Sequence, residues 1–334
     1  MLFKKVKIIA EAGVNHNGNI SYAKKLIDKA KLSGADYIKF QTFDPNLIAT
    51  TSSQIAPYQK KILPKTKNQK KMLSDLSLSS SQFINLANYC KKKKIKFLSS
   101  AFDIPSILFL NKKINIDFFK IPSGEINNIP YLEVLGGLNK KVLLSTGMSS
   151  LREIKSAKKI LEKNGTKSKN ITIMHCVSDY PTQIKDLNMK FINTIKKISP
   201  SVGFSDHSIG YEASMAAVVL GAEFIEKHFT LSKKMKGPDH AISLDVDELG
   251  IFIKKIRITE KLLGKNAKVI TIGENILKKY ARKSIVASKH IKKGDIFTKF
   301  NLTTKRPGDG LSPIFWHKTL GLKAKKNYKE DEKI

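Results

Sequence analysis

Side chains able to bind anions, ligate a metal ion or move protons recur along the chain, each at or just after the end of a short apolar run. They are Glu11, Lys39, Gln41, Ser100, Lys120, Ser123, Glu125, Ser145, His175, Ser205, His207 and His228. The serine hydroxyls and the two ammonium groups suit a small ligand that carries both a phosphate and a carboxylate. Two imidazoles near one carboxylate suit a divalent ion with open coordination positions, which favours a catalytic metal over a structural one.

The apolar runs predict the elements that position these side chains. Strand-like runs alternate with helix-like patterns, which indicates repeated βαβ units. Strands are expected over residues 7–10, 36–40, 96–100, 118–121, 141–145, 171–175, 202–205 and 224–228, with a closing helix over 247–263. This count and size predict an α/β fold of the (β/α)8 TIM-barrel type, and a doubly wound sheet is the alternative. Barrel active sites lie at the carboxyl ends of the strands, so the polar strand ends should share one mouth.

The histidines divide by their position along these strands. His207 and His228 end adjacent strands, and strand one, which carries Glu11, closes the barrel against strand eight. A single strand-end histidine is more often a buried structural group, but two on neighbouring strands favour a metal. His16 could line the mouth or close a turn, and His240 could touch a ligand or face solvent.

The remainder of the chain predicts a second, smaller unit. We expect a barrel domain over residues 1–264, a linker with some helix over 265–282 and a loop-rich β module over 283–334. A module of this size is unlikely to be strongly stable alone, because so small a chain buries little apolar surface. Residues 44–71, rich in Pro, Thr, Ser and Gln, should form an excursion over the barrel mouth.

The amino-acid composition limits the kinds of molecule that the protein is expected to bind. The 334 residues carry a net charge of +33, but 57 of the 61 basic residues are Lys, and they are spread along the whole chain. Nucleic-acid binders cluster their basic residues and favour Arg, so we expect a solvated basic surface and no nucleic-acid partner. Cys90 and Cys176 have no metal-binding or disulfide spacing. No run is long enough to span a membrane, so we expect a cytoplasmic protein without a membrane partner.

A set of short motifs gives the chain a family resemblance. They occupy residues 11–18, 39–42, 120–125, 145–148, 203–207, 226–230 and 237–240. Together they resemble the motifs of sialic acid synthases, in order and at suitable spacings. Residues 305–308 look like the core of the antifreeze-like (SAF) domain that these enzymes carry after the barrel. The resemblance covers essentially the whole chain.

The resemblance implies a role for each matching residue. Lys39, Ser123, Ser145 and Ser205 would hold the phosphate of phosphoenolpyruvate, and Lys120 and Ser100 its carboxylate. His207 and His228 would ligate a divalent ion, Mn²⁺ first with Mg²⁺ or Co²⁺ as alternatives, and Glu11 would act on a water beside it. Gln41, Glu125, Tyr180 and Asp239 would contact an N-acylated amino sugar. Arg306 would reach that sugar from the partner subunit of a homodimer with swapped C-terminal domains.

The reaction implied is N-acetylneuraminate synthesis from phosphoenolpyruvate, N-acetylmannosamine and water, with metal-assisted C–O cleavage and release of phosphate. The alternative within the family is a legionaminic-type acid made from a 2,4-diacetamido-2,4,6-trideoxymannose. A rival of another class is a pyruvate aldolase that uses Lys39 or Lys120 as a Schiff base. Two departures from the family pattern stand out. Residues 99–102 read Ser-Ser-Ala-Phe instead of Ser-Thr-Pro-Phe, and residues 54–69 lack an evident asparagine-bearing sugar loop.

Overall fold

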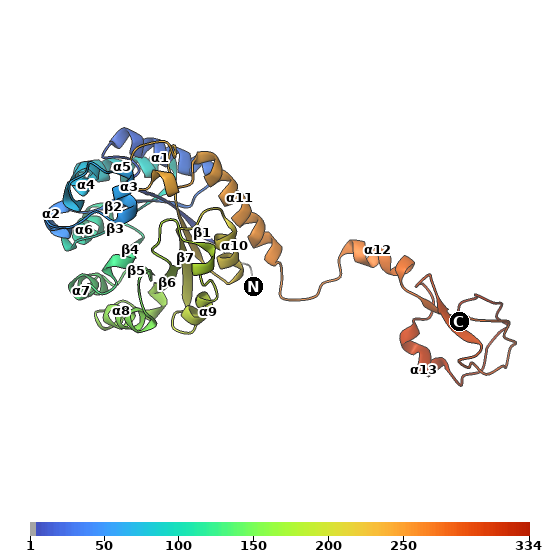
Figure 1. Ribbon diagram of the computed structural model, residues 1–334. Helices are drawn as coiled ribbons and strands as arrows, with labels where there is room; N and C mark the ends of the chain where they lie inside the picture. The colour runs from blue at the N-terminus through green and yellow to red at the C-terminus, as the bar shows by residue number, and fades with distance from the viewer. Residues whose placement is uncertain (1–4) are drawn as a thin grey trace. The chain divides into compact units, whose positions relative to one another are not determined.

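The computed structural model describes residues 5–334 and divides the chain into two compact units. The first unit ends at Gly264, and the second comprises Lys265–Ile334 (Figure 1). Within residues 5–334, no helix combines the length and the apolar character needed to cross a lipid bilayer.

The first unit is a closed barrel of eight parallel strands in sequential order (Figure 1). Its strands are β1 (Lys7–Gly13), β2 (Tyr37–Thr42), β3 (Lys96–Ala101), β4 (Phe118–Ile121), β5 (Lys141–Ser145), β6 (Ile171–Cys176), β7 (Ser201–Asp206) and β8 (Phe224–His228). The barrel closes where β1 pairs with β8, which sets Glu11 opposite His228. The predicted TIM barrel is therefore confirmed. Several strands run one to three residues past their expected ends, because their last residues are also buried.

Helices follow the strands around the outside of the barrel (Figure 1). They are α1 (Ile20–Ser33), α5 (Ser80–Lys93), α6 (Ile104–Phe109), α7 (Ile129–Gly137), α8 (Leu151–Lys163), α9 (Phe191–Lys196), α10 (Glu212–Val219) and α11 (Val246–Leu263), with a π-helical turn η1 (Leu110–Ile114) after α6. Local sequence sets their ends. Ser150 and Glu153 form a capping box at the start of α8, and Gly34 ends α1 with a positive φ of 90°.

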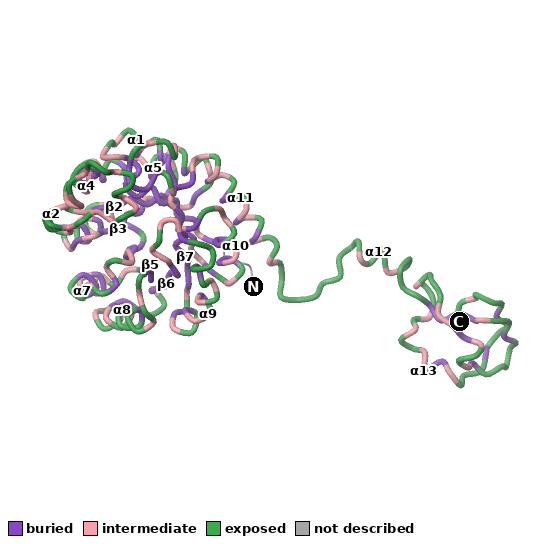
Figure 2. Tube along the Cα trace, viewed as in Figure 1, coloured by how far each residue is buried: buried purple, intermediate pink, exposed green. Residues whose placement is uncertain are grey.

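The core of the barrel unit is continuous, and it joins the strands to the inner faces of the helices. Figure 2 shows the strands as mostly buried and the outer helix faces as exposed. Phe40, Phe119 and Phe204 are among its largest fully buried side chains. Because both faces of a parallel barrel strand are covered, the strands read as apolar runs without a clean alternation. This packing fixes the strand ends rigidly.

The excursion after β2 forms short helices instead of an irregular loop. They are α2 (Pro45–Ile48), α3 (Pro57–Ile62) and α4 (Gln69–Leu76). Val14, Met72 and Leu76 form a small separate core beneath them. Gly18 lies so close to the backbone of α4 that an added Cβ would be 2.7 Å from the carbonyl oxygen of Asp75. The excursion is thus packed onto the loop that follows β1.

The second unit is small and rich in turns, as the sequence predicts. It contains α12 (Ile272–Ala281), an antiparallel pair of strands β9 (Ser284–Ala287) and β10 (Leu302–Lys305), and α13 (Trp316–Thr319). Its buried core consists of Ile285, Ala287, Ile291, Phe297, Leu302, Ala324 and Tyr328. None of the ten described residues of α12 is buried, and Figure 2 shows this helix as largely exposed.

Candidate active site

A cavity of about 860 Å³ opens at the carboxyl ends of the barrel strands. Thirteen of the residues singled out in the sequence line it: Glu11, Lys39, Gln41, Ser100, Lys120, Ser123, Glu125, Ser145, Tyr180, Ser205, His207, His228 and Asp239. Every barrel strand contributes to the lining, either directly or through the loop that follows it. The barrel therefore gathers residues spread over more than 220 positions of the chain around one mouth.

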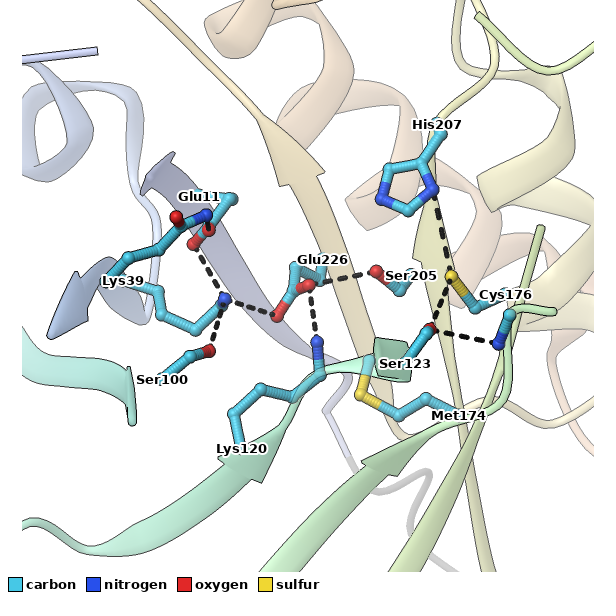
Figure 3. A network of polar contacts seen from close by, with 12 residues as sticks. Glu11, Lys39, Ser100, Lys120, Ser123, Met174, Cys176, Ser205, His207 and Glu226 are labelled. Atoms are coloured by element: carbon cyan, nitrogen blue, oxygen red, sulfur yellow. Dashed lines mark hydrogen bonds and ion pairs between the residues drawn. The ribbon is translucent and has the colours of Figure 1, made fainter. Parts of the chain in front are cut away.

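Lys39 is the centre of a buried polar network at this mouth (Figure 3). Its ammonium nitrogen lies 3.0 Å from Glu11 Oε2 and 3.6 Å from Glu226 Oε2, and it donates a hydrogen bond to Ser100 Oγ at 2.9 Å. Gln41 donates to the other oxygen of Glu11 at 3.3 Å. Charges removed from water need such partners, because an isolated buried ion is strongly destabilised.

Glu226 is a component of the site that the strand-end reasoning missed. Its Oε1 accepts hydrogen bonds from Lys120 at 2.7 Å and from Ser205 at 2.9 Å, so it links the two lysines (Figure 3). It lies two residues before His228 on β8, and side chains two apart in a strand point to the same face. The spacing Glu226–His228 was therefore the available signal.

The two carboxylates have opposite proton affinities. Burial, opposed in part by Lys39, raises the pKa of Glu11 to about 7. Burial acts the same way on Glu226, but Lys120 and Lys39 outweigh it and hold the pKa of Glu226 well below its usual range. Glu226 is thus a fixed negative charge at neutral pH, whereas Glu11 can exchange a proton. Divergent pKa values of this kind suit general acid–base chemistry.

Hydroxyl and thiol groups line the side of the mouth formed by β4, β5 and β6. Ser123 Oγ accepts a hydrogen bond from the backbone N–H of Gly147 at 3.0 Å and donates to Cys176 Sγ at 3.7 Å. A side chain at Gly147 would collide with Ser178, its Cβ lying 2.1 Å from Oγ. Ser145 Oγ is buried without a hydrogen-bond partner in the described chain. The hydroxyl and thiol groups on this side can donate hydrogen bonds to a bound anion.

The two strand-end histidines meet across the mouth, with ring centroids 5.6 Å apart. His207 Nδ1 lies 2.7 Å from the carbonyl oxygen of Val177, which only accepts, so Nδ1 carries a proton and Nε2 is the nitrogen available to a ligand. Although burial acts to lower it, the neighbouring Cys176 and the Val177 carbonyl raise the pKa of His207. His228 Nδ1 is buried and has no hydrogen-bond partner among residues 5–334. Burial, with the charge of His207, holds the pKa of His228 well below its usual range, which keeps this imidazole neutral. These features fit a pair of metal ligands, although no set of three His, Cys, Asp or Glu side chains in the described residues is arranged as a metal site.

Aromatic rings and a carboxyl group form the outer wall of the cavity. The rings of Tyr58 and Tyr180 stack with centroids 5.3 Å apart, and Tyr180 lies 4.2 Å from the ring of His207. The Tyr58 hydroxyl also contacts the carboxyl group of Asp239, whose pKa burial raises to about 6. Glu125 also lines the cavity, and it accepts a hydrogen bond from Asn128 at 2.7 Å. Tyr58 comes from α3, so the excursion contributes to the wall as expected.

Three histidines considered in the sequence, His16, His175 and His240, do not line the cavity. The expectation that His175 faces the mouth is wrong: its Nε2 lies 2.6 Å from the carbonyl oxygen of Leu187, and its ring stacks on Phe204 outside the barrel. It is one residue from Cys176, which lines the cavity, so strand alternation turns it outward. His16 and His240 are buried beside the mouth and do not line the cavity.

Arg306 belongs to the second unit and lies outside the cavity. It is exposed, and its Nε donates a hydrogen bond to the carbonyl oxygen of Ala281 at the end of α12 at 3.1 Å. The guanidinium group is therefore held at the surface of the C-terminal unit, and its other donors have no partner among residues 5–334.

A closed parallel barrel with paired lysines, serine hydroxyls and two imidazoles at its carboxyl end defines an enzyme site. Comparison with known proteins assigns the family. The model of the NeuB family matches residues 26–268 and that of the SAF domain matches residues 282–334. The chain belongs to the NeuB family, and it is an enzyme of sugar-acid biosynthesis.

Relatives of the chain are similar over nearly its whole length. N,N'-diacetyllegionaminic acid synthase of Campylobacter jejuni is 47% identical over 99% of this chain and 99% of its own. The enzyme of that name from Legionella pneumophila is 37% identical over 96% of this chain and 90% of its own. The crystal structure of an N-acetylneuraminic acid synthetase from Leptospira borgpetersenii, in complex with citrate, superposes with a TM-score of 0.70 at 32% identity. It covers 81% of this chain and 90% of that one.

Proposed function

We propose that the chain condenses phosphoenolpyruvate with an N-acylated amino sugar and water, releasing phosphate and a nine-carbon sugar acid. The observation that carries the proposal is the convergence of thirteen matching residues on one cavity. The names of its relatives, two legionaminic acid synthases and a sialic acid synthetase, support it.

Phosphoenolpyruvate would bind on the side of the mouth where donors are concentrated. We assign its phosphate to Lys39, Ser123, Ser145 and Ser205 and its carboxylate to Lys120 and Ser100. Both lysines are already held by carboxylates, so little reorganisation is needed when the ligand arrives. The unpartnered hydroxyl of Ser145 would gain its missing hydrogen bond from the ligand.

The reaction joins C3 of phosphoenolpyruvate to the aldehyde carbon of the open-chain sugar, which leaves positive charge at C2. Glu226, ionised between the lysines, would stabilise that charge. Glu11 would take a proton from the water that attacks C2, a role that suits a carboxylate with a pKa of about 7. The C2–O bond then breaks, and the bridging oxygen leaves with phosphate.

We propose that His207 and His228 hold a divalent ion, with Mn²⁺ first and Mg²⁺ or Co²⁺ as alternatives. The Nε2 atom of His207, left available by the contact of Nδ1 with the Val177 carbonyl, and the neutral ring of His228 support this assignment. Such an ion would polarise the aldehyde oxygen as a Lewis acid.

For the sugar, we propose contacts with Gln41, Glu125, Tyr180 and Asp239. The sequence ranks N-acetylmannosamine first, but the walls of the cavity and the names of two relatives support the opposite order. Stacked tyrosines suit a sugar that carries a methyl group where N-acetylmannosamine carries a hydroxyl. We therefore propose a 2,4-diacetamido-2,4,6-trideoxymannose as the preferred substrate, with N-acetylmannosamine as the second candidate.

We propose that the working unit is a homodimer in which Arg306 of one chain serves the barrel of the other. The surface around Arg306 supports this. On α12, whose last residue it contacts, Ile272, Ile276 and Tyr280 are 84%, 59% and 64% exposed, and they follow one another at four-residue spacing. Such an apolar stripe favours burial against a partner.

The alternative hypothesis, a Schiff-base pyruvate aldolase, has less support than the condensation with phosphoenolpyruvate. A lysine nucleophile must be neutral, and its pKa is usually lowered for that role. Although burial acts to lower it, Glu11 and Glu226 raise the pKa of Lys39. Lys120 is paired with Glu226 at 2.7 Å.

The test is product analysis. The protein is mixed with phosphoenolpyruvate, Mn²⁺ and each of the two sugars, and phosphate release and sugar acids are measured. One phosphate per sugar acid is expected, and trapping with borohydride and pyruvate should label nothing. Turnover of pyruvate with a borohydride-trapped lysine would establish the aldolase instead.

A further inference from the structure

A buried ion pair lies behind the two histidines, on the outer face of β7 and β8. Lys227 Nζ is 2.8 Å from Asp206 Oδ2, and their side chains are 3% and 0% exposed. The two residues are register partners in the sheet, one position before His207 and His228 respectively. Alternation along the strands turns this pair outward and the histidines toward the cavity.

The pair fixes the backbone on both sides of His207. Asp206 Oδ1 accepts hydrogen bonds from the backbone N–H and the hydroxyl of Ser208, at 2.9 and 2.6 Å. Lys227 donates to the carbonyl oxygen of Ser208 at 2.6 Å. Both residues that flank His207 are therefore tied to the same pair of charges.

A third attachment reaches the surrounding helices. Asp206 Oδ2 also accepts a hydrogen bond from Ser214 Oγ on α10, at 2.6 Å. The carboxylate thus has four partners and no unsatisfied oxygen, which offsets the cost of burying it. Together with the Val177 carbonyl that orients the ring, these contacts leave His207 little freedom.

The next pair on the same outer face, two residues earlier on each strand, carries no charge. There Phe204 and Ile225, also register partners, are fully buried and apolar. An apolar pair is often as stabilising as a buried ion pair, but it lacks the directional bonds that fix a turn. The charged pair Asp206–Lys227 lies next to the two histidines, where the orientation of both side chains matters.

We propose that Asp206 and Lys227 are positioning residues that set His207 opposite His228 at the distance a shared divalent ion requires. This inference rests on the metal assignment made under the proposed function. Neither residue faces the cavity, so both act only through the histidines.

The experiment measures Mn²⁺ binding by electron paramagnetic resonance, together with the melting temperature. The variants are Asp206→Asn, Lys227→Met, the double variant, and Ser214→Ala, which removes a single bond. Loss of outer contacts around metal ligands typically weakens affinity about 10- to 100-fold. We expect that loss for Asp206→Asn and for the double variant, and a few-fold loss for Ser214→Ala.

A second ion pair supplies the matched control. Arg257 on α11 pairs with Asp36, just before β2, at 2.9 Å. Asp36→Asn combined with Arg257→Met should lower the melting temperature and leave the Mn²⁺ dissociation constant unchanged.

Two outcomes overturn the inference in distinguishable ways. Unchanged Mn²⁺ affinity in a folded double variant and in Ser214→Ala would make the pair purely structural. Failure of the unaltered protein to bind Mn²⁺ would overturn the metal assignment, and the positioning role with it.

Discussion

The barrel and the C-terminal unit differ in how completely their polar groups are used. At the barrel mouth, Lys39 and Lys120 are paired with the buried carboxylates of Glu11 and Glu226. In the C-terminal unit, Arg306 is exposed, and its one hydrogen bond within residues 5–334 goes to the carbonyl oxygen of Ala281. A preorganised network is typical of the place where charge develops in a reaction, and an exposed guanidinium is typical of a recognition contact.

The two units also differ in packing. The barrel has a large continuous main core, whereas the C-terminal core has seven buried residues and α12 exposes Ile272 and Tyr280. The barrel should therefore keep its chemistry without help, and the C-terminal unit should affect only sugar use. Five predictions test this division, from the largest expected effect to the smallest.

Substitution of a proposed metal ligand should abolish turnover. His207→Ala removes one of two imidazoles, and we expect at least about a 10³-fold fall in kcat, because a Lewis acid contributes several kcal/mol. Chelation should have the same effect on the unaltered enzyme, and Mn²⁺, Co²⁺ or Mg²⁺ should reverse it. His175→Gln is the control, since that ring lies outside the barrel and should change only the melting temperature. Full activity in chelator would contradict the metal assignment.

Removal of the proposed base should change both rate and pH profile. Since the pKa of Glu11 is raised to about 7, the carboxylate is protonated below that pH and cannot accept a proton from water. We expect kcat/KM to rise with pH to a plateau above about 7, because kcat/KM reports the pKa values of the free enzyme. Glu11→Gln should lower kcat by about 10²- to 10⁴-fold and remove this acid limb. A limb that persists unchanged in Glu11→Gln would assign it to another group.

Loss of the Arg306 guanidinium group should weaken the use of the sugar and leave phosphoenolpyruvate binding unchanged. Hydrogen bonds to charged groups contribute about 1.5–3 kcal/mol, so Arg306→Ala should lower kcat/KM for the sugar by about 10- to 100-fold. The KM for phosphoenolpyruvate should not change, and Arg306→Lys should recover part of the loss.

Mixing subunits tests whether the site is shared between chains. Arg306→Ala and His207→Ala subunits should together regain some activity, because a heterodimer then contains one intact composite site. No recovery after verified subunit exchange would mean that each C-terminal unit serves its own barrel.

The smallest effect concerns which sugar is preferred. Tyr58 stacks on Tyr180 and contacts Asp239, so Tyr58→Asn should shift preference from the trideoxy sugar toward N-acetylmannosamine by about tenfold. The measurement is kcat/KM for both sugars side by side. An unaltered enzyme that prefers N-acetylmannosamine by more than tenfold would reverse our proposed order.

The sequence predicted most of the barrel because strands and helices follow local patterns. It missed Glu226 and misplaced His175 for one physical reason. Both faces of these strands are buried, so the hydrophobic pattern does not reveal which residues point inward. The stacking of Tyr58 on Tyr180 joins positions 122 residues apart and leaves no local signal.

The fate of the bridging oxygen tests the central claim most directly. Phosphoenolpyruvate labelled with ¹⁸O between C2 and phosphorus is turned over with the sugar, and both products are analysed by mass spectrometry. If water attacks C2 with Glu11 as base, the label leaves in inorganic phosphate. Label retained in the sugar acid would mean that the P–O bond breaks, and would contradict the roles given to Glu11 and Glu226.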